Sequence, residues 1–497
     1  MMNEKLKDKF LIKLPCKLKD VLLKFDKNAL GIVFVVDNNL KLLGSITDGD
    51  IRRAYLNKNI TNIVRRSSKF INKKVFYLNF NSSISTILKY LSNSSNKNKF
   101  KCIPLVNNKR IVIDISTIQN LRNIPITNIR FGNEELNNVV QAVKSGWISS
   151  KGGFVENFEN EFSKYLGGGY SLTTSSGTSA LELGLKSLRI EPKDEVIVPN
   201  FSFAASINAI LNVGARPVIV DIDKKTWTID IKKLQKLINR KTKAIMPVHI
   251  YGQSCDMDKI MEISKKYKLK VIEDAAEALG GTYKGKLIGL KGDCSCFSFF
   301  ANKTITTGEG GMVVFKDKKH YETGKIIRSH GMTPKKPYRH SIVGSNYRMT
   351  NLQASIGMAQ LKKVNKLLKE RKKVFEYYDS RLSHNKEITL LPKNNWSTNS
   401  YWLYTVLINK IGKIKRDKLI SGLLKKGIET RPTFFPFNKM LPFKTFAKGS
   451  FSVSEEIAYN GISLPSNSIN FKDQDYIIRQ LLLEINKLST KRFYKKQ

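Results

Sequence analysis

Two residues in the middle of the chain combine a reactive side chain with a buried setting. Lys303 closely follows the apolar run CSCFSFF, and Asp274 ends the run KVIED, so both are expected where buried strands end. A lysine at such an apolar site has a lowered pKa and can form a Schiff base with a carbonyl group. A carboxylate there needs a partner that offsets its desolvation, and a protonated ring nitrogen is one such partner. The pair therefore predicts Schiff-base chemistry.

A segment upstream is suited to bind phosphate. In SSGTSALELGLKSL, residues 175–188, Ser, Gly and Thr precede a predicted helix whose Leu181, Leu185 and Leu188 form one apolar side. Backbone N–H groups at a helix start bind phosphate well, although Ser and Thr also cap helices that bind nothing. A lysine in so basic a protein is likewise often a solvated surface charge. The informative feature is therefore the order of the three parts: phosphate cradle, aspartate, lysine.

Strand and helix patterns alternate from about residue 170 onward. Apolar runs such as EVIVP, RPVIVDI and KVIEDAA are separated by helical segments such as MDKIMEISKKYK. This alternation predicts a mainly parallel sheet covered by helices, with a ligand site at the carboxyl ends of the strands. A long helical stretch, residues 358–382, leads to a mixed tail, so we expect a smaller C-terminal lobe from about residue 365. His249, in the strand VHIYG, is expected to be a packed residue rather than a catalyst.

The first 120 or so residues follow a different pattern. Apolar runs at 31–37 and 41–47 flank an Asn-Asn turn and lead into a helical stretch, and a similar pattern returns at 103–116. The segment around 121–131 carries a proline and no strong period, so the domain boundary is placed there. We expect an N-terminal α+β domain of two related halves over residues 1–122 and a larger α/β domain over 123–497.

Length and composition exclude several other classes of protein. The 497 residues exceed what one ordinary core holds. A surplus of 86 Lys and Arg over 41 Asp and Glu gives a net charge of +45, but the basic residues are scattered, so a nucleic-acid partner is not expected. The five cysteines have no metal-ligand spacing, and no metal site is expected. Because apolar runs of membrane-spanning length and a signal peptide are both lacking, we expect no membrane association and a cytoplasmic location.

Long strings between about residues 124 and 488 resemble the DegT/DnrJ/EryC1/StrS family of sugar aminotransferases. They are SGWISSKGGFVENFENEFSKYLG, TSSGTSALELGL, PVHIYGQSCDMD, IEDAAEALGGTYKGK, SFFANKTITTGEGGM and GSNYRMTNLQASIGMAQL. The resemblance implies the α/β fold of fold type I pyridoxal phosphate enzymes, a mainly parallel sheet with a smaller C-terminal lobe. It also implies pyridoxal 5'-phosphate as the cofactor and transamination as the reaction.

The resemblance implies roles for four residues around the cofactor ring. Lys303 would hold the cofactor as a Schiff base and then move a proton between the cofactor and the substrate carbon. Asp274 would pair with the ring nitrogen and so keep the ring able to accept electrons. Phe203 would stack on the ring, with Phe201 assigned to the core. Glu277 would lie near the ring hydroxyl, where many relatives carry Gln or His.

The same resemblance implies how the cofactor's phosphate is bound. The backbone at Gly177 and Thr178 would bind it together with the Ser298 hydroxyl. Asn346 would reach the phosphate from a second subunit. The active enzyme is therefore expected to be a homodimer with shared active sites.

The strings YRHSIVGSNYRMTNLQASIGMAQL, IETRPTFFPFNKMLPF and SEEIAYNGISLPS look most like the perosamine synthase branch of the family. That implies GDP-4-keto-6-deoxymannose as the substrate, aminated at C4 with glutamate as the donor. Arg348 and Arg431 offer cations for the pyrophosphate, although Arg431 is equally an ordinary surface charge. UDP- and dTDP-linked keto sugars are the alternative substrates. A non-catalytic nucleotide sensor is a third interpretation, disfavoured because the lysine, the aspartate and Ser298 are all intact.

The first N-terminal half, GIVFVVDNNLKLLGSITDGDIRRAY, resembles a CBS domain. In that family a Thr and an Asp hold the ribose of an adenine nucleotide, so the resemblance implies Thr47 and Asp50 as candidate contacts. Asp48 or Asp50 is equally suited to cap the helix that begins there. The second half is degenerate, since it keeps the strands but loses the polar pair. A ligand-binding role and a purely structural role of this domain both stay open.

Overall fold

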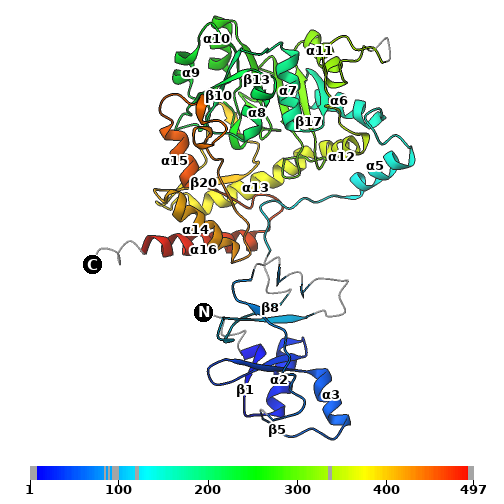
Figure 1. The fold of residues 1–497 in the computed structure, drawn as a ribbon, viewed down its shortest axis with the longest axis vertical. Coiled ribbons are helices and arrows are strands. Elements are labelled where there is room, and N and C mark those ends of the chain that lie inside the picture. The colour runs from blue at the N-terminus through cyan, green and yellow to red at the C-terminus, as the bar shows by residue number, and fades with distance from the viewer. Residues whose placement is uncertain are drawn as a thin grey trace. The chain divides into compact units, whose positions relative to one another are not determined.

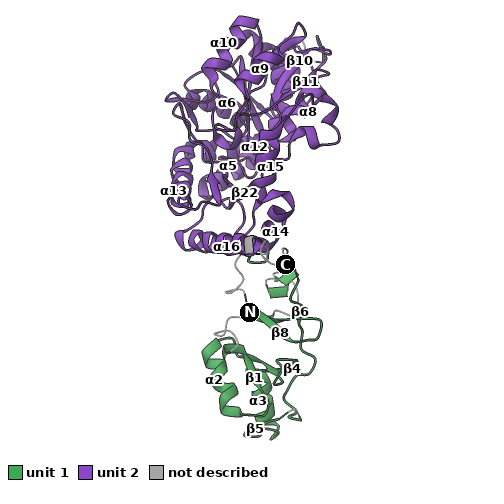
Figure 2. Cartoon of the chain, turned by 90° about the vertical axis from the view of Figure 1, so that its left-hand side faces the viewer, with its two compact units in different colours: residues 1–123, 425–427 green, residues 124–424, 428–497 purple. Residues whose placement is uncertain are grey.

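The computed structural model describes residues 8–65, 67–82, 86–87, 90–91, 100–117, 123–333 and 338–490. The chain divides into two compact units (Figure 2), which are Met1–Asn123 with Lys425–Gly427, and Ile124–Leu424 with Ile428–Gln497. Each unit is described by itself. In the described part of the chain, no helix has both the length and the apolar character needed to cross a bilayer.

The N-terminal unit contains the same β-hairpin twice. β3 (Ile32–Val36) pairs antiparallel with β4 (Leu42–Thr47), and β7 (Cys102–Val106) pairs antiparallel with β8 (Val112–Thr117). Both hairpins shift register at the same step of their first strand, before its last residue. The two related halves predicted from the sequence are therefore present in the backbone.

The turns of the two hairpins are also alike and bond to each other. Asp37 in one turn and Asn107 in the other accept backbone N–H bonds two and four residues ahead. The N–H of Leu42 donates to the carbonyl of Arg110, and the N–H of Val112 donates to that of Leu40, at 2.9 Å each. The pairing of the turns joins the halves into one unit.

The other described elements of this unit are short. A further three-stranded sheet joins β6 to β7 and β8, and β2 pairs with β5. The bounds are β1 (Leu11–Lys13), β2 (Cys16–Lys17), α2 (Leu18–Asn28), α3 (Asp48–Leu56), β5 (Ile63–Val64) and β6 (Leu78–Asn79).

A seven-stranded sheet forms the centre of the larger unit, in the order β11-β10-β12-β13-β16-β17-β9. Figure 1 labels β10, β13 and β17 of this sheet. β17 runs antiparallel to both of its neighbours, and the other adjacent pairs are parallel. The predicted mainly parallel sheet is confirmed. Its strands are β9 (Tyr170–Thr174), β10 (Glu195–Pro199), β11 (Arg216–Val220), β12 (Thr242–Ile245), β13 (Lys270–Asp274), β16 (Cys294–Ser298) and β17 (Gly311–Phe315).

Both faces of this sheet are covered because its strands are apolar on both sides. In β10, Val196 and Val198 pack into one core and Ile197 into the other. The first core includes α7 (Gly177–Ser187), α8 (Ala204–Asn212) and α11 (Lys318–Arg328). The second includes α6 (Gly153–Leu166), α9 (Ile231–Leu237), α10 (Met257–Tyr267) and α12 (Asn351–Lys362). Leu181, Leu185 and Leu188 are buried in the first core, as their spacing predicts.

The C-terminal part of this unit forms a separate layer around an antiparallel sheet, β18-β20-β22-β21. Its core draws on three helices and on Ile124. The elements are α13 (Val364–Leu382), β18 (Ile388–Leu390), β20 (Tyr404–Ile408), α14 (Gly412–Leu424), β21 (Arg431–Pro432), α15 (Ser452–Asn460), β22 (Gly461–Leu464) and α16 (Phe471–Thr490). Outside both sheets lie α5 (Asn133–Lys144) and a small sheet of β14 (Thr282–Tyr283), β15 (Lys286–Leu287) and β19 (Ser397–Thr398).

The long helical stretch predicted over 358–382 is two helices, so that prediction is wrong in this detail. α12 ends at Lys362 and α13 begins at Val364, because Lys363 between them has φ −105° and ψ 10°. The ammonium of Lys363 forms an ion pair with the buried Glu135 of α5. The break between α12 and α13 therefore coincides with a long-range contact, and no proline or glycine in the sequence marks it.

Candidate active site

Two of the predicted site residues end neighbouring strands of the central sheet. Asp274 is the last residue of β13 and Ser298 the last of β16, and the two strands are parallel, with Asp274 opposite Cys296. The loop that follows β16 carries Lys303. The aspartate and the start of the lysine loop therefore meet at the carboxyl edge of the sheet, where the alternating pattern predicts a ligand site.

Asp274 is a buried carboxylate held by two neutral donors. Its side chain accepts a hydrogen bond from the Ser206 hydroxyl at 2.6 Å and one from the backbone N–H of Ala276 at 3.2 Å. Burial raises the pKa of Asp274, while these two bonds and the positive charge of Lys303 work in the opposite direction. A cationic group beside this carboxylate would be stabilised by it.

Ser206 joins Asp274 to the predicted stacking residue. Phe203 directly precedes α8, and Ser206 lies in the first turn of this helix. The side chain of Phe203 is 61% exposed, whereas that of Phe201 is fully buried, which agrees with the sequence-based assignment of Phe201 to the core. The exposed ring of Phe203 thus lies at the start of the helix whose Ser206 donates a hydrogen bond to Asp274.

Lys303 belongs to a group of three ionisable residues. Burial lowers the pKa of its amine, and the negative charges of Glu277 and Asp274 oppose that effect. Glu277 is 6% exposed and accepts the backbone N–H of Tyr251 at 2.6 Å. Burial raises the pKa of Glu277 to about 7, against the opposing effects of Lys303 and of the bond from Tyr251. The charges of Lys303, Asp274 and Glu277 therefore act on one another's pKa values.

The predicted phosphate cradle is the start of α7. Ser176 caps the helix by accepting the N–H of Ser179 at 3.1 Å, which leaves Gly177 and Thr178 as the first helical residues, with no helical acceptor for their N–H groups. A Cβ atom on Gly177 would lie 2.9 Å from the Cβ of Ser298. Glycine is therefore required for β16 to approach the helix start, and the predicted pair Gly177 and Ser298 are close neighbours.

The other predicted contacts, Asn346, Arg348 and Arg431, are exposed or only partly buried. Asn346 is exposed and precedes Tyr347, whose carbonyl accepts the N–H of Ser175 at 2.8 Å. Arg348 is partly buried, with its guanidinium 3.5 Å from the Nε2 of His330. Arg431 has a side chain 61% exposed and forms an ion pair with Glu429 at 2.5 Å, an arrangement typical of an ordinary surface charge.

His249 is a packed residue, as the sequence predicts. It is fully buried, its Nδ1 accepts the backbone N–H of Cys255 at 3.1 Å, and its Nε2 lies 3.0 Å from a carboxylate oxygen of Glu273. Its own backbone N–H donates to the carbonyl of Asp274 at 3.0 Å. His249 therefore stabilises the end of β13 through its contacts with Glu273 and Asp274.

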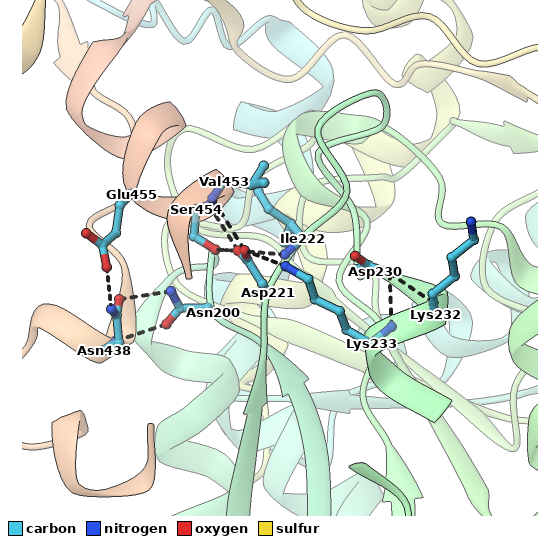
Figure 3. Close-up of polar contacts among 10 residues, drawn as sticks. All are labelled: Asn200, Asp221, Ile222, Asp230, Lys232, Lys233, Asn438, Val453, Ser454 and Glu455. Carbon is cyan, nitrogen blue, oxygen red and sulfur yellow. Dashed lines mark hydrogen bonds and ion pairs between the residues drawn. The ribbon is translucent and has the colours of Figure 1, made fainter. Parts of the chain in front are cut away.

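A polar clamp that sequence reasoning missed ties the sheet edge to the C-terminal lobe (Figure 3). Asn200 directly follows β10, and its amide exchanges two hydrogen bonds of 2.9 Å with Asn438, one with its side chain and one with its backbone N–H. Asp221 directly follows β11 and accepts the N–H and hydroxyl of Ser454 and the ammonium of Lys233. A polar residue at the end of each predicted strand was the signal that could have found both.

An aromatic column, also missed, stands between the same two lobes. Tyr251 stacks on Phe434, with ring centroids 5.4 Å apart, and on Trp402, with centroids 5.9 Å apart. Phe434 in turn lies 6.0 Å from Phe203. Trp402 and Phe434 come from the C-terminal lobe, whereas Tyr251 and Phe203 come from the large domain, so no local pattern links them.

In the N-terminal unit, Thr47 and Asp50 form a reciprocal helix cap. The Asp50 carboxylate accepts the backbone N–H of Thr47 at 2.8 Å and its hydroxyl at 2.6 Å, and the Thr47 hydroxyl lies 3.2 Å from the N–H of Asp50. Arg53 binds the other carboxylate oxygen of Asp50 at 2.6 Å. The prediction that the second half loses both polar residues is wrong for the threonine, because Thr117 ends β8 as Thr47 ends β4. The position three residues later lies outside the described residues.

Comparisons with known proteins agree with this geometry. The profile of the DegT/DnrJ/EryC1/StrS aminotransferase family matches residues 130–482, and that of the CBS domain matches residues 12–57. The chain is 41% identical over 366 residues to the GDP-perosamine synthase of Caulobacter vibrioides, covering 73% of this chain and 99% of that protein. It is 40% identical over 346 residues to the GDP-perosamine synthase of Escherichia coli O157:H7, covering 70% and 94%.

A solved structure shows the same fold. The PLP form of the putative sugar aminotransferase Spr1654 from Streptococcus pneumoniae superposes with a TM-score of 0.70 at 31% identity, covering 74% of this chain and 99% of that one. The predicted fold class and cofactor are thereby confirmed, together with an N-terminal CBS domain. The chain belongs to the DegT/DnrJ/EryC1/StrS aminotransferase family and is a pyridoxal phosphate-dependent sugar aminotransferase.

Proposed function

We propose that the chain transfers the amino group of glutamate to C4 of GDP-4-keto-6-deoxymannose and so makes GDP-perosamine or a close relative. Such a product serves polysaccharide biosynthesis, as in O-antigen. At the site itself, the proposal is supported above all by the partly buried Lys303 with the buried Asp274 and Glu277 at the carboxyl edge of the sheet. The GDP-linked substrate is supported by the two GDP-perosamine synthases at 41% and 40% identity.

The residues at this edge fit pyridoxal 5'-phosphate. The start of α7 and the Ser298 hydroxyl offer donors for a phosphate. Asp274 offers a buried carboxylate for a protonated ring nitrogen, and the exposed face of Phe203 offers a stacking surface. Glu277 would lie near the ring hydroxyl. When bound, the cofactor supplies a ring that accepts the electron pair released at the substrate carbon.

In this proposal the amine of Lys303 has two tasks. It holds the cofactor by a covalent bond. Once released, it takes a proton from the substrate carbon and delivers that proton to the cofactor. Burial lowers the pKa of the amine, so its uncharged form is more accessible near neutral pH. Asp274 keeps the ring nitrogen protonated, because it is a carboxylate that gains from a cationic neighbour.

The substrate's pyrophosphate requires cations. Arg348 is the better candidate, since its Nε is buried without a hydrogen-bond partner among the described atoms. Arg431 is exposed and already paired with Glu429, which makes it the weaker one. UDP- and dTDP-linked 4-keto sugars are the second candidate substrates, because the groups around the cofactor serve any nucleotide equally. The proposed setting is the cytoplasm.

We further propose a homodimer in which Asn346 of a second copy reaches the phosphate. α5 exposes Leu136, Val140 and Val143, which recur at the spacing of one helix face, and Trp147 and Ile148 follow it. A row of exposed apolar side chains is typical of a protein–protein contact, here with the same face of a second copy. The dimer contact is assigned to this face.

An adenine nucleotide in the CBS domain is a separate proposal, tested by calorimetry with AMP, ADP and ATP. Binding should weaken in Asp50→Ala, because one carboxylate oxygen of Asp50 holds Thr47 and the other holds Arg53. Arg52→Ala, which removes an exposed charge from the same helix, is the control. The absence of heat with all three nucleotides would leave the domain a structural role.

The main proposal is tested by product analysis. Purified full-length enzyme with pyridoxal phosphate and glutamate is offered GDP-, UDP- and dTDP-linked 4-keto-6-deoxy sugars, and the amino sugars are identified by mass spectrometry and NMR. The GDP compound should be aminated at C4 with the highest kcat/KM. Lys303→Ala should lose both turnover and the visible absorbance of the bound cofactor, and Lys291→Ala should keep both. Amination of a UDP or dTDP sugar with the GDP compound untouched would overturn the substrate but not the transamination.

A further inference from the structure

The amine of Lys303 lies on the face of an indole ring. Its Nζ is 3.9 Å from the ring centroid of Trp402, a side chain only 4% exposed. A cation over the face of a tryptophan is attracted by the ring's negative charge density, and tryptophan is the best of the aromatic side chains in this respect. The attraction is strengthened because water is excluded from the buried indole.

Two further sets of hydrogen bonds link Trp402 to the loop that carries Lys303. The indole Nε1–H of Trp402 donates to the carbonyl of Asn302 at 3.0 Å. The guanidinium of Arg371, from α13, donates to the carbonyl of Lys303 at 3.1 Å and to that of Trp402 at 2.8 Å. Arg371 is 2% exposed, and a rigid fork of this kind sets the distance between the two carbonyls.

The indole itself is also packed against a second aromatic ring. Tyr251 stacks on Trp402 with an interplanar angle of 18°, and the backbone N–H of Tyr251 donates to Glu277. The stacked pair of Trp402 and Tyr251 therefore contacts both the amine of Lys303 and the carboxylate of Glu277, whose charge acts on that amine. A lysine side chain has four rotatable bonds and gains a defined position only when its surroundings provide one.

We propose that Trp402 is a positioning residue for Lys303: its face holds the lysine amine in one place whenever that amine is not covalently bonded. Arg371 keeps the two residues at a fixed separation. The inference rests on the proposed role of Lys303, and it explains how the released amine stays within reach of the substrate carbon. Trp402 touches neither the cofactor's phosphate nor its ring nitrogen in this proposal.

The test measures how fast Lys303 bonds to the cofactor at different pH values. Cofactor-free full-length chain is mixed with pyridoxal phosphate, and the visible absorbance is followed. Because only the uncharged amine reacts, the midpoint of the rate against pH reports the pKa of Lys303. The chains compared are the natural one, Trp402→Leu, Trp402→Phe and the control Trp396→Leu, which removes a partly buried indole bonded instead to the carbonyl of Ser254.

Trp402→Leu should move the midpoint to lower pH by roughly 0.4 to 1.5 pH units, because the ammonium loses the ring that stabilised it. Trp402→Phe should move it in the same direction by less, and Trp396→Leu should leave it in place. An unchanged midpoint in both Trp402 variants, or a shift to higher pH, would overturn the proposal. If the leucine variant does not fold, as judged by circular dichroism, the phenylalanine variant decides alone.

The experiment also separates this inference from the proposed function. Lys303→Ala mixed with the cofactor in the same way should develop no absorbance. Absorbance in that variant would mean that another amine bonds the cofactor, and the role of Lys303 itself would fall. Absorbance lost in Lys303→Ala but unaltered midpoints in the Trp402 variants would remove only the indole's role.

Discussion

Burial and charge act against each other on the three ionisable side chains of the site. Burial alone favours the neutral forms, which raises the pKa of Asp274 and Glu277 and lowers that of Lys303. The opposite charges of the lysine and the carboxylates favour the ionised forms. Each residue's protonation therefore depends on the other two, and a bound cation beside Asp274 would change all three.

Asp274→Asn should keep the cofactor but lose most of the rate. The amide replaces a negative charge with a neutral group of the same shape, so the ring nitrogen is no longer held protonated. We expect a fall in kcat of roughly 10²-fold or more, the size typical for loss of an electrostatic partner at a reacting centre. Asp293→Asn, which alters a carboxylate that pairs with Lys270 at the opposite end of the strands, is the control. Unchanged kinetics in Asp274→Asn would remove the residue from the site.

Glu277 should make the cofactor-free protein less stable as the pH rises. The folded pKa of about 7 exceeds the ordinary value of 4.5. Its contribution to stability is thus fully present below about pH 4.5 and is lost as the pH rises through 7. Denaturant unfolding of the wild type at pH 5 and pH 8, compared with Glu277→Gln, should show an extra loss of about 2 to 3 kcal/mol in the wild type. Equal losses in the two proteins would contradict this.

At the scale of the elements, the sequence reveals what is local. Alternating apolar runs predict the strands, and Asp274 is placed correctly because it ends its own run. β16 ends at Ser298, two residues before the run CSCFSFF ends. The break at Lys363 has no local signal, since it coincides with a contact to Glu135 more than two hundred residues earlier. Trp402 and Arg371 were missed for the same reason. They meet Lys303 and its neighbour Asn302 across 68 to 100 residues of sequence, and nothing in a lysine-rich helix distinguishes one buried arginine.

Asn438→Ala should destabilise the enzyme through the clamp between the lobes. The change leaves the fully buried Asn200 amide without its side-chain partner, and an unsatisfied buried polar group costs about 1–3 kcal/mol. Lys439→Ala is the control, because it removes only a partly exposed ion pair with Glu455. The midpoints of denaturant unfolding give the comparison. If Asn438→Ala loses no more stability than Lys439→Ala, the hydrogen bonds between Asn200 and Asn438 do not stabilise the enzyme as proposed.

At the scale of the whole molecule, the catalytic unit should work without the N-terminal one. A chain that begins at Ile124 keeps the residue whose carbonyl accepts the N–H of Glu429 and whose side chain belongs to the core of the C-terminal lobe. We expect it to fold and to transaminate at a rate within a few-fold of the full chain. Limited proteolysis near residue 123 should release the same fragment. A chain from Ile124 that folds but cannot transaminate would mean that the N-terminal unit takes part in catalysis.

Leu136→Glu should convert the proposed dimer into monomers. A charge on the exposed apolar face of α5 would have to be buried in the contact, which is strongly unfavourable. Size-exclusion chromatography with light scattering should show half the mass, and activity should fall because Asn346 of the second copy is lost. Ile414→Glu places the same charge on an equally exposed residue of α14 and should change neither. A dimeric Leu136→Glu would place the contact elsewhere.

The antiparallel strand β17 also has a consequence for how the protein is made. Among the described strands, β9 lies at the edge of the central sheet and pairs only with β17, so this partner is missing until roughly 140 further residues have been synthesised. At ribosomal rates of about 5–20 residues per second, that wait is roughly 7 to 28 s. The start of α7, the predicted phosphate cradle, follows β9 closely and packs against β16 and β17. The start of α7 therefore leaves the ribosome early but can pack in its final position only after β16 and β17 have been synthesised.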